Sequence, residues 1–202
     1  FVKFFASYNS LAVFCNNSLK NFMSILKILK YPDKRLRKIA KPVTSFDSKL
    51  KKLTEDMAQT MYDAPGIGLA ATQVDVHLRV IVIDISKERN NLLTIINPTI
   101  HNKSSDSKKF EEGCLSVPGV FEEVSRADNI ELTYFDVSGK KIELSTDGLL
   151  AVCIQHEMDH LIGKVFVDHL SRLKQDRITK KIIKGKISTS GIQRPSLSET
   201  LA

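Results

Sequence analysis

Residues 149–161, with the sequence LLAVCIQHEMDHL, constrain the fold of this chain more than any other segment. The segment is mostly apolar and long enough for a helix, and Gly163 follows it at a position where glycine often ends a helix. Such a helix belongs in a protein core, where polar side chains without partners are energetically costly. Five polar residues therefore need partners or a ligand there: Gln155, His156, Glu157, Asp159 and His160.

The two histidines of this segment have the spacing of a metal site. His156 and His160 are four residues apart, so they share one face of the predicted helix and can bind one ion together. Glu157 follows the first histidine, where its carboxylate can reach water on that ion. This H-E-x-x-H pattern is typical of metal hydrolases in which the glutamate carries a proton. The alternative is a chance arrangement on a solvated face, which the apolar residues around it argue against.

A catalytic metal ion needs a third protein ligand and one open coordination position. Cys114, within EEGCLSVPGV, is the best candidate because Gly113 before it lets the backbone approach closely. A single cysteine is, however, more often a small buried apolar residue. The segment GIGLAATQ alternates Gly66 and Gly68 with apolar residues and ends at Gln73. It is too short for a phosphate-binding loop, and the plain alternative is a turn after the preceding helix.

Hydrophobic periodicity predicts an α+β fold, in which antiparallel β-sheets pack around a central helix that carries the histidines. Further helices are expected towards the N-terminal and C-terminal ends of the domain. The predicted elements are helices at 48–63, 149–161 and about 169–184, strands at 79–85 and 92–98, and a strand meander at 120–144 with a hairpin turn at Ser138-Gly139.

The bulk composition indicates a globular, moderately basic protein. With 202 residues, 42% of them hydrophobic, the chain is long enough for one domain with a core. The formal net charge of +7 favours anionic partners such as RNA or phospholipid without establishing either. Three cysteines without disulfide spacing favour a reducing compartment, so we expect a cytoplasmic protein. No apolar run is long enough to span a membrane, and nothing in the sequence requires more than a monomer.

The two ends of the chain differ in composition from the middle. Residues 1–22 contain no Asp or Glu and precede the first methionine, Met23. We interpret them as an extension created by start-site choice. A transit peptide to an organelle is the alternative, although the segment lacks arginine. Residues 187–202 are rich in serine and predict a disordered tail, which leaves 23–186 as the expected folded domain.

Three motifs in series resemble the peptide deformylase family. GIGLAATQ resembles its first motif, EGCLSVP its second and QHEMDH its third, and their order agrees with the family. The opening LKILKYPDKRLRKIAKPV is also similar to that of family members, and the resemblance covers about residues 23–184. It implies an enzyme that removes the formyl group from the N-terminal formylmethionine of newly synthesised polypeptides and releases formate.

The resemblance also implies a cofactor and its ligands. Cys114, His156 and His160 would bind one Fe²⁺ ion, with water in the fourth position and Glu157 as the proton carrier. Zn²⁺, Ni²⁺ or Co²⁺ can occupy the same site in the family. The ligand types do not decide between these ions, because a Cys-His-His site suits zinc as well as iron.

The same resemblance assigns residues to the substrate. The Gln73 side chain and the Leu115 backbone N–H would stabilise the oxyanion that develops on the formyl group. The residues expected to contact substrate are Gly66, Ile67, Gly68, Gly113, Val152 and Cys153. For Val152 and Cys153, the alternative is that they serve only in helix packing.

Further features concern partners and specificity. The basic segment 170–186 resembles the C-terminal helix that bacterial family members place on the ribosome, and a merely solvated basic helix is the alternative. Many bacterial members carry a charged or polar residue, often Arg, near the position of Phe121, so downstream substrate preference can differ here. Arg126 and Glu112 are expected to orient neighbouring groups.

Two other functions compete with deformylation. A metalloprotease shares H-E-x-x-H, but such endopeptidases usually take a third His or a Glu as ligand instead of a distant cysteine. An RNA- or ribosome-binding module with a structural zinc would need four protein ligands and no open position. Cleavage of internal peptide bonds would indicate the metalloprotease. Activity and binding that are unchanged in Glu157→Gln would indicate the module with a structural zinc.

Overall fold

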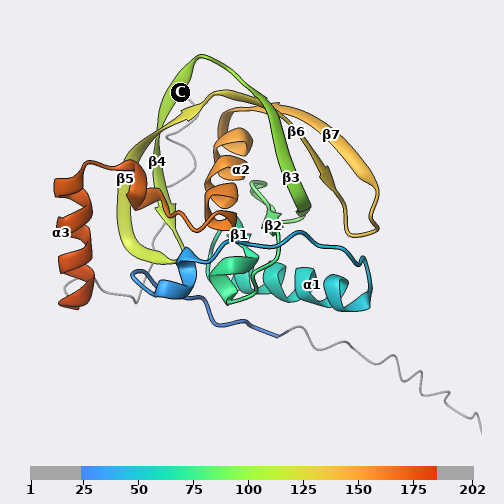
Figure 1. Ribbon diagram of the computed structural model, residues 1–202, viewed down its shortest axis with the longest axis horizontal. Coiled ribbons are helices and arrows are strands. Elements are labelled where there is room, and N and C mark those ends of the chain that lie inside the picture. Colours follow the sequence, from blue (N-terminus) through green and yellow to red (C-terminus); the bar gives the residue numbers. More distant parts are fainter. Residues whose placement is uncertain (1–23, 186–202) are drawn as a thin grey trace, which may run out of the picture.

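The computed structural model describes residues 24–185, which form an α+β fold with antiparallel sheets, as predicted (Figure 1). The predictions for residues 1–22 and 187–202 concern segments outside the described residues. The α-helices are α1 (Ser48–Asp63), α2 (Gly148–Leu161) and α3 (Arg172–Ile183), and the 3-10 helices are η1 (Lys34–Arg37), η2 (Ala71–Val74) and η3 (Phe166–His169). The strands are β1 (Gly68–Ala70), β2 (Val80–Ile83), β3 (Leu93–Lys103), β4 (Ser107–Cys114), β5 (Val117–Ala127), β6 (Asn129–Phe135) and β7 (Lys141–Asp147).

The strands of residues 24–185 form two antiparallel sheets with α2 between them. The larger sheet has the order β1-β2-β3-β6-β7, and the smaller one pairs β4 with β5. Helix α2 packs against β1, β2, β6 and β7 of the larger sheet and against β5 of the smaller one (Figure 1). Residues on α2 therefore face β7, which directly precedes the helix, and also strands from distant parts of the sequence.

Helix α1 has the bounds that the periodicity predicts. Leu50, Met57 and Met61 are buried along one of its faces. Asp47 caps its N-terminus, where its carboxylate accepts hydrogen bonds from the N–H groups of Lys49 and Leu50, both at 3.0 Å. The helix packs against β1 and β2, the strands that follow it in the chain.

Helix α2 lies in the core, as its composition predicts. Ile154 is fully buried in a cluster with side chains of the larger sheet. Gln155 is buried too, and its amide donates to the backbone carbonyls of Ala127 and Ala151 at 2.9 and 3.0 Å. Gly163, with φ +75°, follows the helix in the left-handed conformation that glycine adopts at helix ends.

Two strand predictions need correction. The segment 92–98 starts β3, but the strand continues to Lys103, because Pro98 falls at a register shift where a missing N–H is tolerated. The segment 120–144 is not one meander, because β5 pairs with β4 and β6 pairs with β3 and β7. The predicted hairpin turn joins β6 to β7, with Gly139 at φ +84°.

Two strands were not predicted at all. Strand β4 carries four charged residues and is exposed along most of its length, so it shows no apolar alternation. Its pairing with β5 depends on the rest of the fold. The segment 66–73 is not a plain turn, because Gly68 begins β1 opposite Ile83 of β2, and η2 follows directly.

The last helix begins later than the predicted residue 169. Residues Phe166–His169 form η3, and Leu170 is extended, so α3 starts at Arg172 after its N-cap Ser171. Among residues 24–185, no helix combines the length and apolar character that crossing a bilayer requires.

Candidate metal and substrate site

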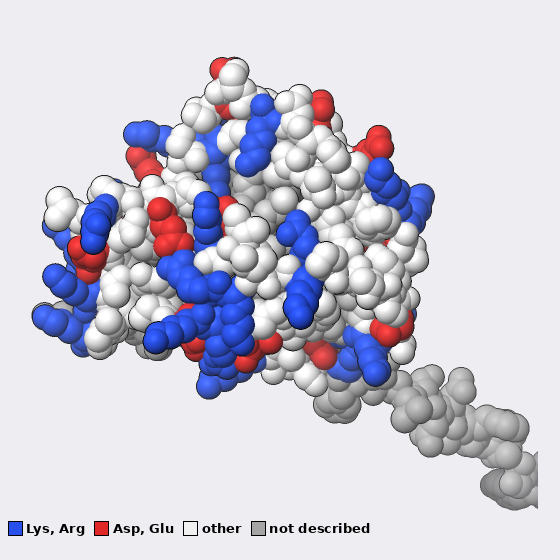
Figure 2. Space-filling model, viewed as in Figure 1, with Lys and Arg blue, Asp and Glu red and all other residues white. Residues whose placement is uncertain are grey.

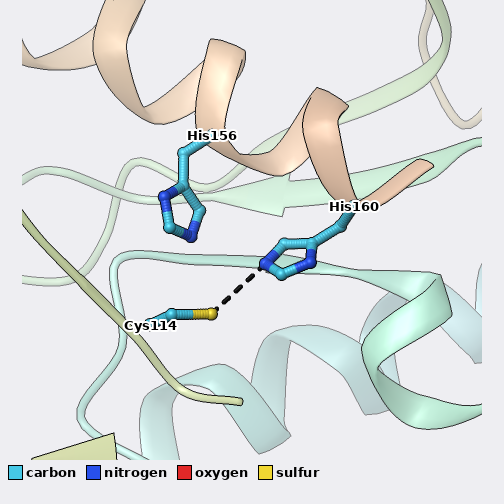
Figure 3. A group of neighbouring side chains, drawn as sticks. All are labelled: Cys114, His156 and His160. Atoms are coloured by element: carbon cyan, nitrogen blue, oxygen red, sulfur yellow. Dashed lines mark hydrogen bonds between the residues drawn. The ribbon is translucent and has the colours of Figure 1, made fainter. Parts of the chain in front are cut away.

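Side chains from α2 and β4 converge at one point (Figure 3). His156 and His160 point from α2 towards Cys114, the last residue of β4. Sγ of Cys114 lies 3.2 Å from Nε2 of His160, and one donor atom from each of the three residues lies within 4.8 Å of the others. The two imidazole centroids are 5.2 Å apart with planes at 73°, so the rings approach this point from different directions.

N–H groups surround the sulfur of Cys114. The β4–β5 pairing shifts its register between Gly113 and Cys114, and the chain turns there. The N–H of Ser116 donates to Sγ at 3.4 Å, and Nε2 of Gln73 donates to it at 3.5 Å. These two donors hold the sulfur in place beside the imidazoles of α2.

The amide of Gln73 is buried and held in one orientation. Its Oε1 accepts a hydrogen bond from the N–H of Ala70 at 2.8 Å, and its Nε2 donates to Oγ of Ser116 at 3.1 Å. Since a backbone N–H can only donate, the amide oxygen must face Ala70 and the nitrogen must face Cys114. The arrangement presents an uncharged donor beside the three converging side chains.

A buried ion pair fixes His156 from behind. Its Nδ1 lies 2.7 Å from Oε2 of Glu112, and Arg126 donates to both carboxylate oxygens of Glu112 at 2.7 and 3.0 Å. Burial would raise the pKa of Glu112, but hydrogen bonds from His156 and Arg126 lower it to about 2. The ionised carboxylate can only accept, so Nδ1 carries a hydrogen and Nε2 is the ring nitrogen that can coordinate a ligand.

The carboxylate of Glu157 lies in a tight, buried position beside Gly68. The residue is 4% exposed, and within residues 24–185 its Oε2 has no hydrogen-bond partner. Burial raises the pKa of Glu157 to about 7, while His156 opposes this shift and Glu112 adds to it. A Cβ atom at Gly68 would lie 2.5 Å from Oε1 of Glu157, so a larger residue would displace the carboxylate.

A cavity of about 260 Å³ opens beside these side chains. Its walls come from the segment after α1, from the β4–β5 pair and from α2. Of the predicted catalytic and metal-binding residues, Gln73 and His160 do not line the cavity. The others do: Cys114, Leu115, His156 and Glu157. All of the residues expected to contact substrate line the cavity: Gly66, Ile67, Gly68, Gly113, Val152 and Cys153.

The converging residues fit a divalent cation. Tetrahedral bonds of about 2.0–2.3 Å to nitrogen and sulfur place neighbouring donor atoms about 3.5 Å apart. The distance of 3.2 Å between Cys114 Sγ and His160 Nε2 is close to this value. One thiolate and two imidazoles suit zinc and iron, and three protein ligands leave the open position of a catalytic site. The Oε2 atom of Glu157, which lacks a partner in the described region, is suited to accept a hydrogen bond from water or substrate.

Several residues around the site were not predicted. Asp159 accepts a hydrogen bond from Arg126 at 2.6 Å, and Phe166 stacks on the imidazole of His156 at a centroid distance of 6.1 Å. Asp159 carried a signal, since it is a charged residue in an apolar helix. The apolar residues could not be told from ordinary core residues. Those that line the cavity are Phe110, Val117, Val120 and Leu149.

Known sequences match most of the chain. The family model described as polypeptide deformylase matches residues 25–176. Peptide deformylase 1 of Burkholderia multivorans is 59% identical over 162 residues, which cover 80% of this chain and 90% of that protein. Peptide deformylase 1 of Ralstonia nicotianae is 58% identical over 165 residues, which cover 82% of this chain and 98% of that protein.

Solved structures of peptide deformylases also match the chain. The crystal structure of a peptide deformylase from Legionella pneumophila matches with a TM-score of 0.77 and 51% identity, covering 81% of this chain and 96% of that one. The peptide deformylase from Ehrlichia chaffeensis, crystallised in complex with actinonin, matches with a TM-score of 0.78 and 40% identity, covering 81% and 99%. The resemblance carried by the three sequence motifs is confirmed, and the chain belongs to the polypeptide deformylase family.

Proposed function

We propose that this chain carries out deformylation at a metal ion bound by Cys114, His156 and His160. Family membership makes it a metal-dependent hydrolase of protein biosynthesis, which removes the formyl group from N-terminal formylmethionine and releases formate. The convergence of these side chains next to the carboxylate of Glu157, at the wall of a cavity, is the observation that supports the assignment. Residues 23–186 would form the catalytic domain; the family model matches residues 25–176 within this range.

The proposed ion is Fe²⁺, with Zn²⁺, Ni²⁺ or Co²⁺ as substitutes. A bound divalent cation supplies Lewis acidity, which lowers the pKa of a coordinated water and draws negative charge onto a substrate oxygen. His156 is prepared for this role because Glu112 holds the hydrogen on Nδ1 and leaves Nε2 free to coordinate. Helix α2, which carries both histidines, would then be the central metal-binding helix of the fold.

Glu157 acts as the proton carrier. It takes a proton from the attacking water, whose oxygen forms a bond to the formyl carbon. It then donates this proton to the amine nitrogen as the C–N bond breaks, so that formate and a free amino terminus leave. The neighbouring Gly68 leaves room for the carboxylate at the cavity wall.

Gln73 and Leu115 stabilise the negative charge that develops on the formyl oxygen. The Gln73 amide is fixed by its bond to Ala70, so its Nε2 remains directed at the reaction centre. The second donor is the backbone N–H of Leu115, which follows Cys114 directly. Donors of this kind contribute about 3 kcal/mol each to lowering a barrier.

The cavity accepts the methionine side chain. Its surface is mostly apolar, which suits an unbranched thioether. Ile67, Val152 and Cys153 provide apolar walls, and Gly66, Gly68 and Gly113 also line the cavity. Because formyl is the smallest acyl group, this tight wall favours it over acetyl.

Formate release tests the reaction. We expect the protein, purified without oxygen, to release formate from formyl-Met-Ala-Ser and to leave acetyl-Met-Ala-Ser intact. Cleavage of an internal peptide bond without formate would instead indicate a metalloprotease. Metal analysis on the same sample identifies the ion.

Metal retention tests the ligand set independently of activity. Cys114→Ala should lose the ion, whereas the matched control Cys153→Ala removes a thiol outside the ligand set and should retain it. Stoichiometric metal in Cys114→Ala would remove this cysteine from the coordination sphere.

A nascent-chain enzyme gains from proximity to the ribosome, and we propose that α3 provides this contact. Arg177, Lys180 and Lys181 are exposed and have no carboxylate partner within residues 24–185. Figure 2 shows Lys and Arg side chains gathered over α3 and η1. Ribosomal RNA is a polyanion that such cations bind through its phosphates.

Sedimentation with ribosomes tests the contact. A variant with Lys180 and Lys181 changed to Glu should sediment less than wild type. The matched variant with Lys140 and Lys141 changed to Glu, in the β6–β7 hairpin, should sediment normally. Equal loss in both would mean that net charge matters and α3 does not. A cytoplasmic monomer is the expected state of the enzyme.

A further inference from the structure

A chain of hydrogen bonds runs from His156 to the surface. Glu112 accepts a hydrogen bond from Nδ1 of His156. Arg126 donates to Glu112 and also, at 2.6 Å, to Asp159. Nε2 of His169 lies 2.7 Å from the same oxygen, Oδ2 of Asp159. His169 lies on η3 and its side chain is 33% exposed, while Arg126 is 5% exposed.

The direction of the bond from His169 follows from the chemistry of the acceptor. A carboxylate can only accept, so Nε2 of His169 carries the hydrogen and donates it to Asp159. Asp159 thereby receives two donors on one oxygen. The Arg126 guanidinium is a rigid fork, so holding its Asp159 end in place also holds the end that bonds to Glu112.

The short helix η3 contacts the same ligand a second time. Phe166, at its start, stacks on the imidazole of His156 with planes at 25°. The helix is itself fixed from outside, because Arg37 of η1 forms an ion pair with Asp168 and donates to the carbonyl of Gly163 at 3.1 Å. One surface segment therefore supports His156 through a ring contact and through hydrogen bonds.

We propose that His169 is a positioning residue for the metal centre. Through Asp159, Arg126 and Glu112, its hydrogen bond helps to hold the His156 imidazole with Nε2 directed at the ion. Groups that support a metal ligand from outside commonly change metal affinity when they are lost. This inference rests on the ligand set proposed above.

The rate of metal loss to a chelator measures this role without the reaction. His169→Phe keeps a ring but cannot donate, and His169→Asn is too short to reach Asp159. Both should lose metal about three- to tenfold faster than wild type, below the 10- to 100-fold typical of a group that touches the ligand itself. His169→Gln can place an amide nitrogen near the position of Nε2 and should restore the wild-type rate.

His101→Phe is the matched control. His101 is also exposed and makes one hydrogen bond, to Oγ1 of Thr133 at 2.8 Å, on β3 outside this network. It should lose metal at the wild-type rate. If the His169→Phe and His169→Asn proteins lost metal no faster than His101→Phe, the proposal would be overturned.

A double variant separates positioning from a general loss of stability. In an Asp159→Asn background the link from His169 is already altered, so adding His169→Phe should increase the rate less than twofold. A full additive effect would contradict the proposed route. The proposed ligand set is tested by separate outcomes. A wild-type protein that binds no metal, or a Cys114→Ala protein that retains it, would refute the ligand set itself.

Discussion

Replacing Gly68 with alanine should disable catalysis and leave the fold largely intact. The added Cβ would lie 2.5 Å from Oε1 of Glu157 and 2.9 Å from Sγ of Cys153. Ordinary contact begins at 3.4 Å, so the carboxylate must move by 3.4 − 2.5 = 0.9 Å. A displacement of about 1 Å at a reacting group costs roughly 100-fold in rate. The carboxylate ends a flexible side chain, so it can move without unfolding the core.

The assay measures kcat/KM for formate release from formyl-Met-Ala-Ser, together with metal content and melting temperature. The matched control is Gly139→Ala, which lies in the β6–β7 hairpin at φ +84°. This control should lose about 1–2 kcal/mol of stability from the left-handed backbone and retain its kcat/KM. A Gly68→Ala protein with normal metal and full kcat/KM would refute the assignment of Glu157 as proton carrier.

Three further outcomes are expected. Glu157→Gln should lower kcat by about 10²- to 10⁴-fold with unchanged metal content, and an unaffected rate of formate release would exclude its role. Glu112→Gln removes one of the two carboxylates that pair with the buried Arg126, so urea unfolding should show a loss of about 1.5–3 kcal/mol in unfolding free energy, the contribution of hydrogen bonds to a charged group. Burial would raise the pKa of Asp168, but Arg37 outweighs it and lowers the pKa. Its stabilising effect is therefore complete above the ordinary carboxyl pKa of about 4 and is lost as the pH falls through the lowered value. The difference in unfolding free energy between wild type and Asp168→Asn should stay constant from about pH 5 to 7 and shrink below about pH 4; a difference that grows in acid would contradict this reasoning.

Local sequence signals were sufficient where one element carries the whole pattern. The spacing of Leu50, Met57 and Met61 determines α1 because a helix face depends on residues close together in the chain. Strand β4 shows the opposite case. Its Lys and Glu residues give no strand signal, and it becomes a strand because β5 returns beside it. Pairing between strands is a tertiary property, so the two-sheet topology could not be predicted from local patterns.

The candidate site divides in the same way. The spacing of His156 and His160 indicated a shared helix face, and the motif resemblance brought in Cys114 from a distant segment. The bond between Asp159 and His169 had no such signal, because nothing in the sequence pairs a residue of α2 with one of η3. Partners that touch only after folding, such as Phe166 on His156, require the structure.

The placement of the converging residues on separate parts of the chain has a consequence for folding. Cys114 and His160 are 46 positions apart, one at the end of a hairpin strand and the other on a core helix. A cation bound by both residues would link the β4–β5 sheet to α2. Its binding free energy would add to the stability of the native state. Depleting the protein of metal would then loosen the β4–β5 hairpin before the five-stranded sheet.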